Sequence, residues 1–165
     1  LESERLSGRH TALQREPTDV RALAEEVLQG LGARHPRATD VRVTAAPGLG
    51  PVALDPARTR LLLRNLLDNA LRHGGAADAP PEVALQADGG ELRLTVRDHG
   101  PGVPDEQLAQ LAQAFYRPDS ARTRSAGGVG LGLYLCKLVG QAHGGRFTLR
   151  NARPGLEAVV TLPPG

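Results

Sequence analysis

Aromatic residues are almost absent from this 165-residue sequence, which has two Phe, two Tyr and no Trp. Methionine is missing as well, so we expect a core built from Leu, Val and Ala. Cysteine occurs once, at Cys136, which excludes an internal disulfide bond. Because Cys136 lies in the apolar stretch "YLCKLV", we predict a buried, reduced thiol rather than a catalytic one, in keeping with a cytoplasmic protein.

An excess of charge of one sign is also lacking, because 20 basic and 18 acidic residues leave a formal net charge of +2. A nucleic-acid-binding surface needs clustered basic residues, so no nucleic-acid partner is expected. The longest apolar runs, such as "RLLLRNLLDNAL", are interrupted by charges and are shorter than the roughly 20 residues of a membrane span. We therefore do not expect this stretch of protein to insert into a membrane.

The length suits one domain with a single core. Residues 1–16 are polar and start with Leu1, and we predict that they are the remnant of an upstream dimerisation helix and its linker, followed by the domain at 17–165. Apolar spacing predicts helices at 19–31, 56–73, 105–115 and 134–143, and strands at 41–46, 52–54, 82–87, 91–98, 146–151 and 157–163. Asp19 and Asp55 are the expected N-caps of the first two helices. This order predicts an α+β fold, a two-layer α/β sandwich with about three helices on one face of a mixed five-stranded sheet.

The predicted helix at 56–73 has an unusual polar face. Asn65, Asn69 and Arg72 recur at helical spacing opposite the leucines of the core face, with Arg58 two turns earlier. Asn is a mediocre helix former, so two of them one turn apart indicate a purpose. Their amide oxygens could hold a hydrated Mg²⁺; the alternative is an ordinary solvent-exposed face.

The turn "DHGPGVP" directly follows the predicted strand at 91–98. Gly100 and Gly102 leave room for a flat ligand near the backbone. Asp98 supplies a carboxylate that only accepts hydrogen bonds, which suits the exocyclic amine of adenine. The alternative is a solvent-exposed turn in which Asp98 bonds its own backbone.

The stretch "GGVGLGL" at 127–133 places four glycines at the entrance of a helix. Free N–H groups and the positive end of the helix dipole attract phosphate at such a position. The stretch is not a P-loop, because the Lys-Ser/Thr pair is missing, and not a dinucleotide-binding fingerprint, because the third glycine position holds Tyr134 or Leu135. A flexible hinge is the alternative.

Taken in order, these motifs resemble the catalytic ATP-binding domain of sensor histidine kinases, within the GHKL superfamily of ATPases and kinases. "NLLDNALRHG" is similar to the family's asparagine box, "DHGPGVP" to its first glycine box, "FYRPDSARTR" to the end of its phenylalanine box and "GGVGLGL" to its second glycine box. "HGGRFTLRN" and "VVTLP" are similar to the family's ending. The resemblance covers nearly the whole chain from about Pro17.

The resemblance implies that ATP and Mg²⁺ bind here. Asn69 would coordinate the metal, Asn65 would assist through water or phosphate, and Asp98 would accept from the adenine amine. The loop from Arg117 to Gly127, with Arg122 and Arg124, would be the ATP lid. The implied ATP-binding residues are Asn65, Asn69, Arg72, His73, Asp98, Gly100, Gly102, Arg117, Gly128, Gly130, Leu131, Gly132 and Leu133, with Asn65, Asn69 and Arg117 as the catalytic set.

Several residues depart from the family's pattern. His73 stands where the family often has Tyr, and Ala112 stands where the phenylalanine box usually begins with an aromatic residue, which leaves only Phe115. Weaker contacts to adenine and looser docking of the lid are expected. Asn65 stands where ATP-hydrolysing relatives and serine kinases of the superfamily typically have Glu, and an amide cannot act as a base. This favours transfer to a histidine, whose neutral ring is already nucleophilic.

None of the five histidines lies in the His-Glu/Asp context of the family's phosphoacceptor; they are His10, His35, His73, His99 and His143. The resemblance implies an acceptor on the kinase's own dimerisation domain, a homodimeric full-length protein in which this chain is the cytoplasmic part of a membrane-bound sensor, and a response regulator as partner. The chain alone is expected to bind ATP and to autophosphorylate weakly or not at all. The alternatives are a degenerate module that binds nucleotide or a protein partner without phosphotransfer, and a GHKL serine kinase.

Overall fold

The computed structural model describes residues 12–74, 79–108 and 129–163. The helices are α2 (Val20–Leu31), α3 (Pro56–Gly74) and α6 (Val129–Ala142), with a short 3-10 helix, η1 (Pro36–Asp40). The strands are β1 (Glu16–Thr18), β2 (Arg42–Ala45), β3 (Val52–Leu54), β4 (Glu82–Asp88), β5 (Glu91–Arg97), β6 (Arg146–Asn151) and β7 (Leu156–Leu162).

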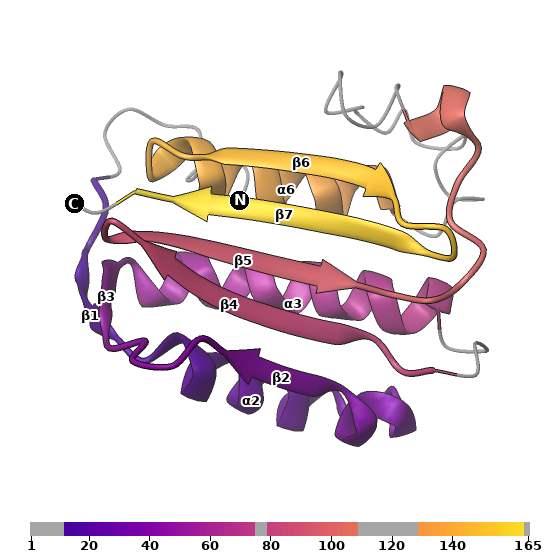
Figure 1. Ribbon diagram of the computed structural model, residues 1–165, viewed down its shortest axis with the longest axis horizontal. Helices are drawn as coiled ribbons and strands as arrows, with labels where there is room; N and C mark the ends of the chain where they lie inside the picture. The colour runs from indigo at the N-terminus through magenta and orange to yellow at the C-terminus, as the bar shows by residue number, and fades with distance from the viewer. Residues whose placement is uncertain (1–11, 75–78, 109–128, 164–165) are drawn as a thin grey trace.

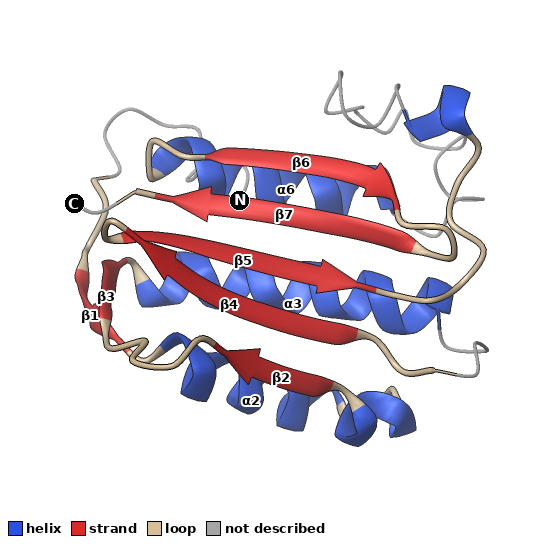
Figure 2. Ribbon diagram, viewed as in Figure 1, coloured by secondary structure: helices blue, strands red, loops and turns tan. Residues whose placement is uncertain are grey.

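Five strands form one mixed sheet in the order β2-β4-β5-β7-β6, in which β2 is parallel to β4 and the other neighbours are antiparallel. Strands β1 and β3 form a separate antiparallel pair. Helices α2, α3 and α6 all lie on one face of the sheet, behind it in the view of Figure 1, and the colours of Figure 2 separate the two layers. The architecture is the predicted α+β two-layer sandwich.

The core between the two layers is built from aliphatic side chains, as the composition predicts. Leu63 and Leu67 of α3 are completely buried because the leucines recur every three or four residues and so share one helix face. Leu92, Leu94 and Val96 alternate along β5 and point to the same layer. The hydrophobic pattern of each element therefore decides which face it presents to the other layer.

The opposite face of the sheet carries a row of charges that crosses all five strands. Cross-strand pairing places Arg42, Glu82, Arg97, Glu157 and Arg150 side by side, so the sign alternates from one edge of the sheet to the other. Neighbouring opposite charges stabilise a strand register, whereas a shift by one residue would bring buried valines and leucines to solvent. The row thus helps to define the register that positions the end of β5.

Helices α2 and α3 start at the predicted capping residues. Asp19 Oδ1 accepts a hydrogen bond from the N–H of Ala22 at 3.0 Å, and Asp55 Oδ1 accepts from the N–H of Arg58 at 3.1 Å. Arg58 itself is 9% exposed, and its Nε lies 3.8 Å from Asp55 Oδ2. Arg58 therefore belongs to the buried start of α3 and not to an exposed polar face.

Helix α6 and the residue that follows it bury two ionisable side chains. Cys136 is fully buried, as predicted, and burial raises the pKa of its thiol so far that it stays protonated. His143 is 2% exposed; its Nδ1 lies 2.9 Å from the carbonyl oxygen of Val139, and its Nε2 accepts from the N–H of Asp55 at 3.1 Å. Burial lowers the pKa of His143, so a neutral ring links the end of α6 to the start of α3.

The segment before α2 is attached to the domain. Arg15 donates hydrogen bonds to the carbonyl oxygens of Ala53 at 3.1 Å, His143 at 3.3 Å and Pro163 at 3.4 Å. Strand β1 then pairs with β3, although the sequence shows no strand pattern there. Docking on β3 supplies backbone partners that the local sequence cannot reveal. The predicted boundary between residues 16 and 17 stays a prediction.

Candidate functional site

Three segments that are distant in the sequence meet beside the core, namely the second half of α3, the end of β5 and the start of α6. They enclose a narrow pocket of about 10 Å³, which is room for about one water molecule. Its walls must therefore separate to admit a larger ligand. The pocket is lined by Leu66, Asn69, Ala70, Val96, Asp98, Leu133, Leu149, Leu156 and Ala158.

Asp98 is 4% exposed, and its carboxylate has a defined orientation. Oδ1 accepts hydrogen bonds from the backbone N–H groups of Gly100 at 2.9 Å and Leu156 at 3.3 Å. The bond from Gly100 is the local backbone bond expected of Asp98 in a solvent-exposed turn, but Asp98 is buried here. Among the described residues both bonds go to Oδ1, so Oδ2 is the oxygen left for a ligand in the pocket.

The two asparagines of α3 are half-buried rather than on an open solvent-exposed face. Asn69 lines the pocket. Asn65 lies one turn earlier, and its Nδ2 donates to the carbonyl oxygen of Leu61 at 2.8 Å. A Cβ added at Gly132 would lie 3.3 Å from Asn65 Oδ1, so α6 packs closely against this amide. The asparagine and second glycine motifs are therefore in contact.

The first turn of α6 lies at the pocket, because Gly132 approaches Asn65 and Leu133 lines the pocket wall. Gly130 and Leu131 belong to the same turn. A helix N-terminus offers unpaired N–H groups and the positive end of a dipole. This helix end would stabilise an anion bound near Gly132 and Asn65.

Arg72 and His73 have exposed side chains at the end of α3, and neither lines the pocket. Arg72 Nη2 lies 2.7 Å from Asp68 Oδ2 in an ion pair within the helix. Local desolvation, and then the charge of Arg72, lower the pKa of His73, while the carboxylate of Asp98 acts in the opposite direction. The imidazole of His73 is therefore neutral at physiological pH.

Several predicted residues lie outside the described residues. These are Arg117, Gly128, Ala112, Phe115, Arg122, Arg124 and the lid at 117–127. Of the helix expected at 105–115, the described part is a helical turn at 105–108. The roles assigned to the lid stay predictions.

A Mg²⁺ site at this pocket would have few protein ligands. Among residues 12–74, 79–108 and 129–163 there is no group of three or more His, Cys, Asp or Glu side chains that could hold a metal ion. Mg²⁺ commonly keeps several waters and takes only one or two ligands from the protein besides the phosphates of a substrate. The half-buried amide of Asn69, which supplies an oxygen at the pocket wall, fits this mode of binding.

The turn between β6 and β7 also contributes to the site, which the sequence did not predict. Leu156 bonds Asp98 through its backbone, and Gly155 lies so close that an added Cβ would be 1.8 Å from the carbonyl oxygen of Asp98. Asn151 contacts the turn that follows Asp98. The only sequence signal was the similarity of "HGGRFTLRN" to the family's ending, which assigns no role to these residues.

A buried carboxylate, an amide and a helix N-terminus at one pocket of a two-layer sandwich are the features of a nucleotide-binding α+β domain. Residues 54–165 match the family described as "Histidine kinase-, DNA gyrase B-, and HSP90-like ATPase". The chain belongs to this family, and the predicted family membership is thereby confirmed.

Curated relatives refine this placement. The chain is 38% identical over 111 residues to the sensor histidine kinase YkoH of Bacillus subtilis, covering 67% of this chain and 24% of YkoH. It is 39% identical over 110 residues to the signal transduction histidine-protein kinase BaeS of Escherichia coli, covering 66% of this chain and 23% of BaeS. The chain thus spans about a quarter of the length of these relatives.

Solved structures agree with the relatives. The ATP-binding domain of PrrB from Mycobacterium tuberculosis aligns with a TM-score of 0.67 and 26% identity, covering 92% of this chain and 98% of that one. Full-length ShkA, crystallised in complex with AMPPNP, aligns with a TM-score of 0.73 and 27% identity, covering 98% of this chain and 33% of ShkA. These matches identify the chain as a catalytic ATP-binding domain of the histidine kinase type.

Proposed function

We propose that this chain binds ATP in the pocket of Asn69, Asp98 and Leu133 and transfers the γ-phosphoryl group to a histidine on an upstream dimerisation domain. The observation that carries the proposal is the convergence of these three residues, from three separate motifs, on one pocket at the start of α6. In this proposal the pocket opens on binding, with the adenine beside Asp98 and the phosphates at the N-terminus of α6.

Each part of the pocket has a distinct task in this proposal. Asp98 Oδ2 accepts a hydrogen bond from the adenine amine, while Oδ1 stays bonded to the backbone. The N-terminus of α6, with Gly128, Gly130 and Gly132, binds the phosphates. Arg117 and the lid add positive charge beside them, and Arg72 and His73 would contact the nucleotide from the end of α3. Mg²⁺, when bound by Asn69, would neutralise phosphate charge during transfer.

Asn65 supports phosphoryl transfer rather than hydrolysis of ATP. Its Nδ2 donates to Leu61, and an amide has no basic lone pair with which to activate water. A neutral histidine acceptor needs no such base, because its ring nitrogen carries a nucleophilic lone pair. The protein then contributes mainly positioning and charge stabilisation.

Replacing Asn69 by Ala is expected to abolish the effect of Mg²⁺ on ATP binding, because the metal loses its ligand at the pocket wall. Calorimetric titration of ATP with Mg²⁺ and with EDTA measures the effect. Arg64→Ala, which changes an exposed residue of the same helix, serves as the control and should keep the Mg²⁺ dependence. Full Mg²⁺ dependence in Asn69→Ala would show that Asn69 is not the ligand.

Phosphoryl transfer itself is tested with γ-³²P-labelled ATP. The chain is mixed with a separately produced dimerisation domain of the same kinase, and the label is expected on a histidine of that domain. Because phosphohistidine is labile in acid and phosphoserine is stable, acid treatment distinguishes a histidine kinase from the alternative of a GHKL serine kinase. Binding of ATP without any labelling would favour the other alternative, a degenerate module that binds nucleotide without phosphotransfer.

The remaining parts of the proposal concern the whole protein. We propose a homodimer formed through the dimerisation domain, a response regulator as the recipient of the phosphoryl group, and a place for this chain in the cytoplasmic portion of a membrane-bound sensor. The names of the relatives, which are sensor and signal transduction histidine kinases, support these partners. Among the described helices, none has both the length and the apolar composition needed to cross a bilayer.

A further inference from the structure

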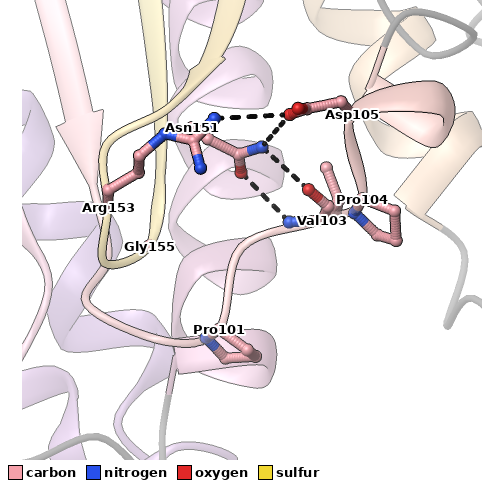
Figure 3. Close-up of a pocket in the computed structure, with 7 residues that line it drawn as sticks. All are labelled: Pro101, Val103, Pro104, Asp105, Asn151, Arg153 and Gly155. Carbon is pink, nitrogen blue, oxygen red and sulfur yellow. Dashed lines mark hydrogen bonds and ion pairs between the residues drawn. The ribbon is translucent and has the colours of Figure 1, made fainter.

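Asn151, the last residue of β6, holds the backbone of the loop that follows Asp98. Its Oδ1 accepts from the N–H of Val103 at 3.1 Å, and its Nδ2 donates to the carbonyl oxygen of the same residue at 2.8 Å. The amide therefore satisfies both backbone groups of Val103. Figure 3 shows this pair of bonds across the pocket between the loop and the β6–β7 turn, with a further contact of 3.2 Å from Nδ2 to Asp105.

The fit between Asn151 and the loop is close. Gly102 has a φ of +75°, and an added Cβ would lie 2.6 Å from Asn151 Oδ1. A side chain at Gly102 would thus be strained by the backbone conformation and would displace the amide. Glycine is therefore required at this position of "DHGPGVP" both by the positive φ and by the amide of Asn151, 49 positions further along the chain.

The other end of the loop is attached to the same turn. The N–H of Asp98 donates to the carbonyl oxygen of Leu156 at 3.0 Å, and the N–H of Leu156 donates to Asp98 Oδ1 at 3.3 Å. The loop from Asp98 to Val103 is therefore fixed at both ends by residues 151–156. Within this loop, only Asp98 lines the proposed ATP pocket and makes the contact with adenine.

We propose that Asn151 is a positioning residue for nucleotide binding, which acts by holding the loop at 98–103 in the conformation that directs Asp98 Oδ2 into the pocket. This inference rests on the proposed binding of ATP. Without the amide, the loop samples more conformations, and ordering it upon binding costs affinity. The carboxylate accepts a hydrogen bond from the adenine amine. Removing the Asn151 amide should therefore weaken recognition of the adenine more than binding of the phosphates.

The test compares Asn151→Ala with the unchanged chain by calorimetry, using ATP and GTP, which differ in the base. Asn151→Ala is expected to weaken ATP binding by about tenfold, a typical consequence of losing hydrogen bonds of this kind, and to leave GTP binding nearly unchanged. The near-isosteric Asn151→Asp keeps an acceptor for the N–H of Val103 but turns an oxygen toward the carbonyl of Val103 and the carboxylate of Asp105, so it should weaken ATP binding at least as much as Asn151→Ala. It also serves if Asn151→Ala does not fold.

Arg153→Ala is the matched control from the same turn. Its guanidinium reaches Asp105 at 3.6 Å with both side chains exposed, and such surface pairs contribute little, so ATP affinity should not change. Unaltered ATP affinity in Asn151→Ala, or an equal loss for ATP and GTP, would overturn the inference, since a merely structural role lowers both. Absence of ATP binding by the unchanged chain would instead contradict the proposed function, and the inference with it.

Discussion

Replacing Asp98 by Asn is expected to weaken ATP binding by about 100-fold, which corresponds to the loss of roughly 2.7 kcal/mol from a charge-assisted hydrogen bond. The substitution keeps the size of the side chain and changes only one oxygen to an NH₂ group. Gly100 and Leu156 both donate to Oδ1, so the orientation of the new amide matters.

Neither orientation of the amide restores the contact. If its oxygen accepts from Gly100 and Leu156, its NH₂ group meets the adenine amine, and two donors face each other. If the amide turns over, the NH₂ group meets the two backbone donors inside a residue that is only 4% exposed. The effect should therefore be large even though the pocket keeps its shape.

Calorimetric titration with ATP measures this effect. Asp88→Asn makes the same chemical change at an exposed residue at the end of β4 and should leave ATP affinity unchanged. Circular dichroism confirms that both variants fold. If Asp98→Asn bound ATP as tightly as the unchanged chain, the adenine contact would have to be assigned to another residue.

Gly155→Ala is expected to destabilise the fold by at least about 3 kcal/mol, because it combines strain with a steric overlap. Gly155 has a φ of +92°, which disfavours any residue with a Cβ. The added Cβ would lie 1.8 Å from the carbonyl oxygen of Asp98 and 2.9 Å from the Cα of His99. These are backbone atoms at the end of β5, so relief of the overlap must move the strand end that carries Asp98.

Gly48→Ala separates the two causes. Gly48 has a similar φ of +82°, but nothing lies within 4 Å of an added Cβ. The substitution Gly48→Ala should therefore lower the free energy of unfolding only by the conformational strain, about 1–2 kcal/mol. Urea unfolding followed by circular dichroism measures both variants. Equal losses of stability would mean that the β6–β7 turn has room to move away from Asp98.

Local sequence rules predicted most of the elements that form the fold. Leucine spacing predicted α3 with its core face, and alternation predicted β5, since each pattern depends only on the helical or strand period. Asp19 and Asp55 were predicted as caps because capping needs only atoms within three residues. In contrast, β1 was missed, because its pairing partner β3 lies more than 30 residues away.

The residues of the candidate site also fall into those that the sequence predicted and those that only the structure revealed. Asn69 and Asp98 carry donor and acceptor chemistry that is visible in the sequence, and the order of the motifs led to the family. The prediction that Arg58 belongs to the polar face of α3 was wrong, because Arg58 is buried at the start of this helix. Asn151 was missed because an asparagine at the end of a strand has no local signal for a contact with Val103.

The sequence by itself determined the class of fold, the family and the chemical groups of the site, because these follow from periodicity and from motifs of a few residues. Only the tertiary structure decided which oxygen of Asp98 remains for a ligand and which distant residues hold its loop. Those facts depend on the sheet register that places the β6–β7 turn beside the end of β5, and register is a property of several strands together.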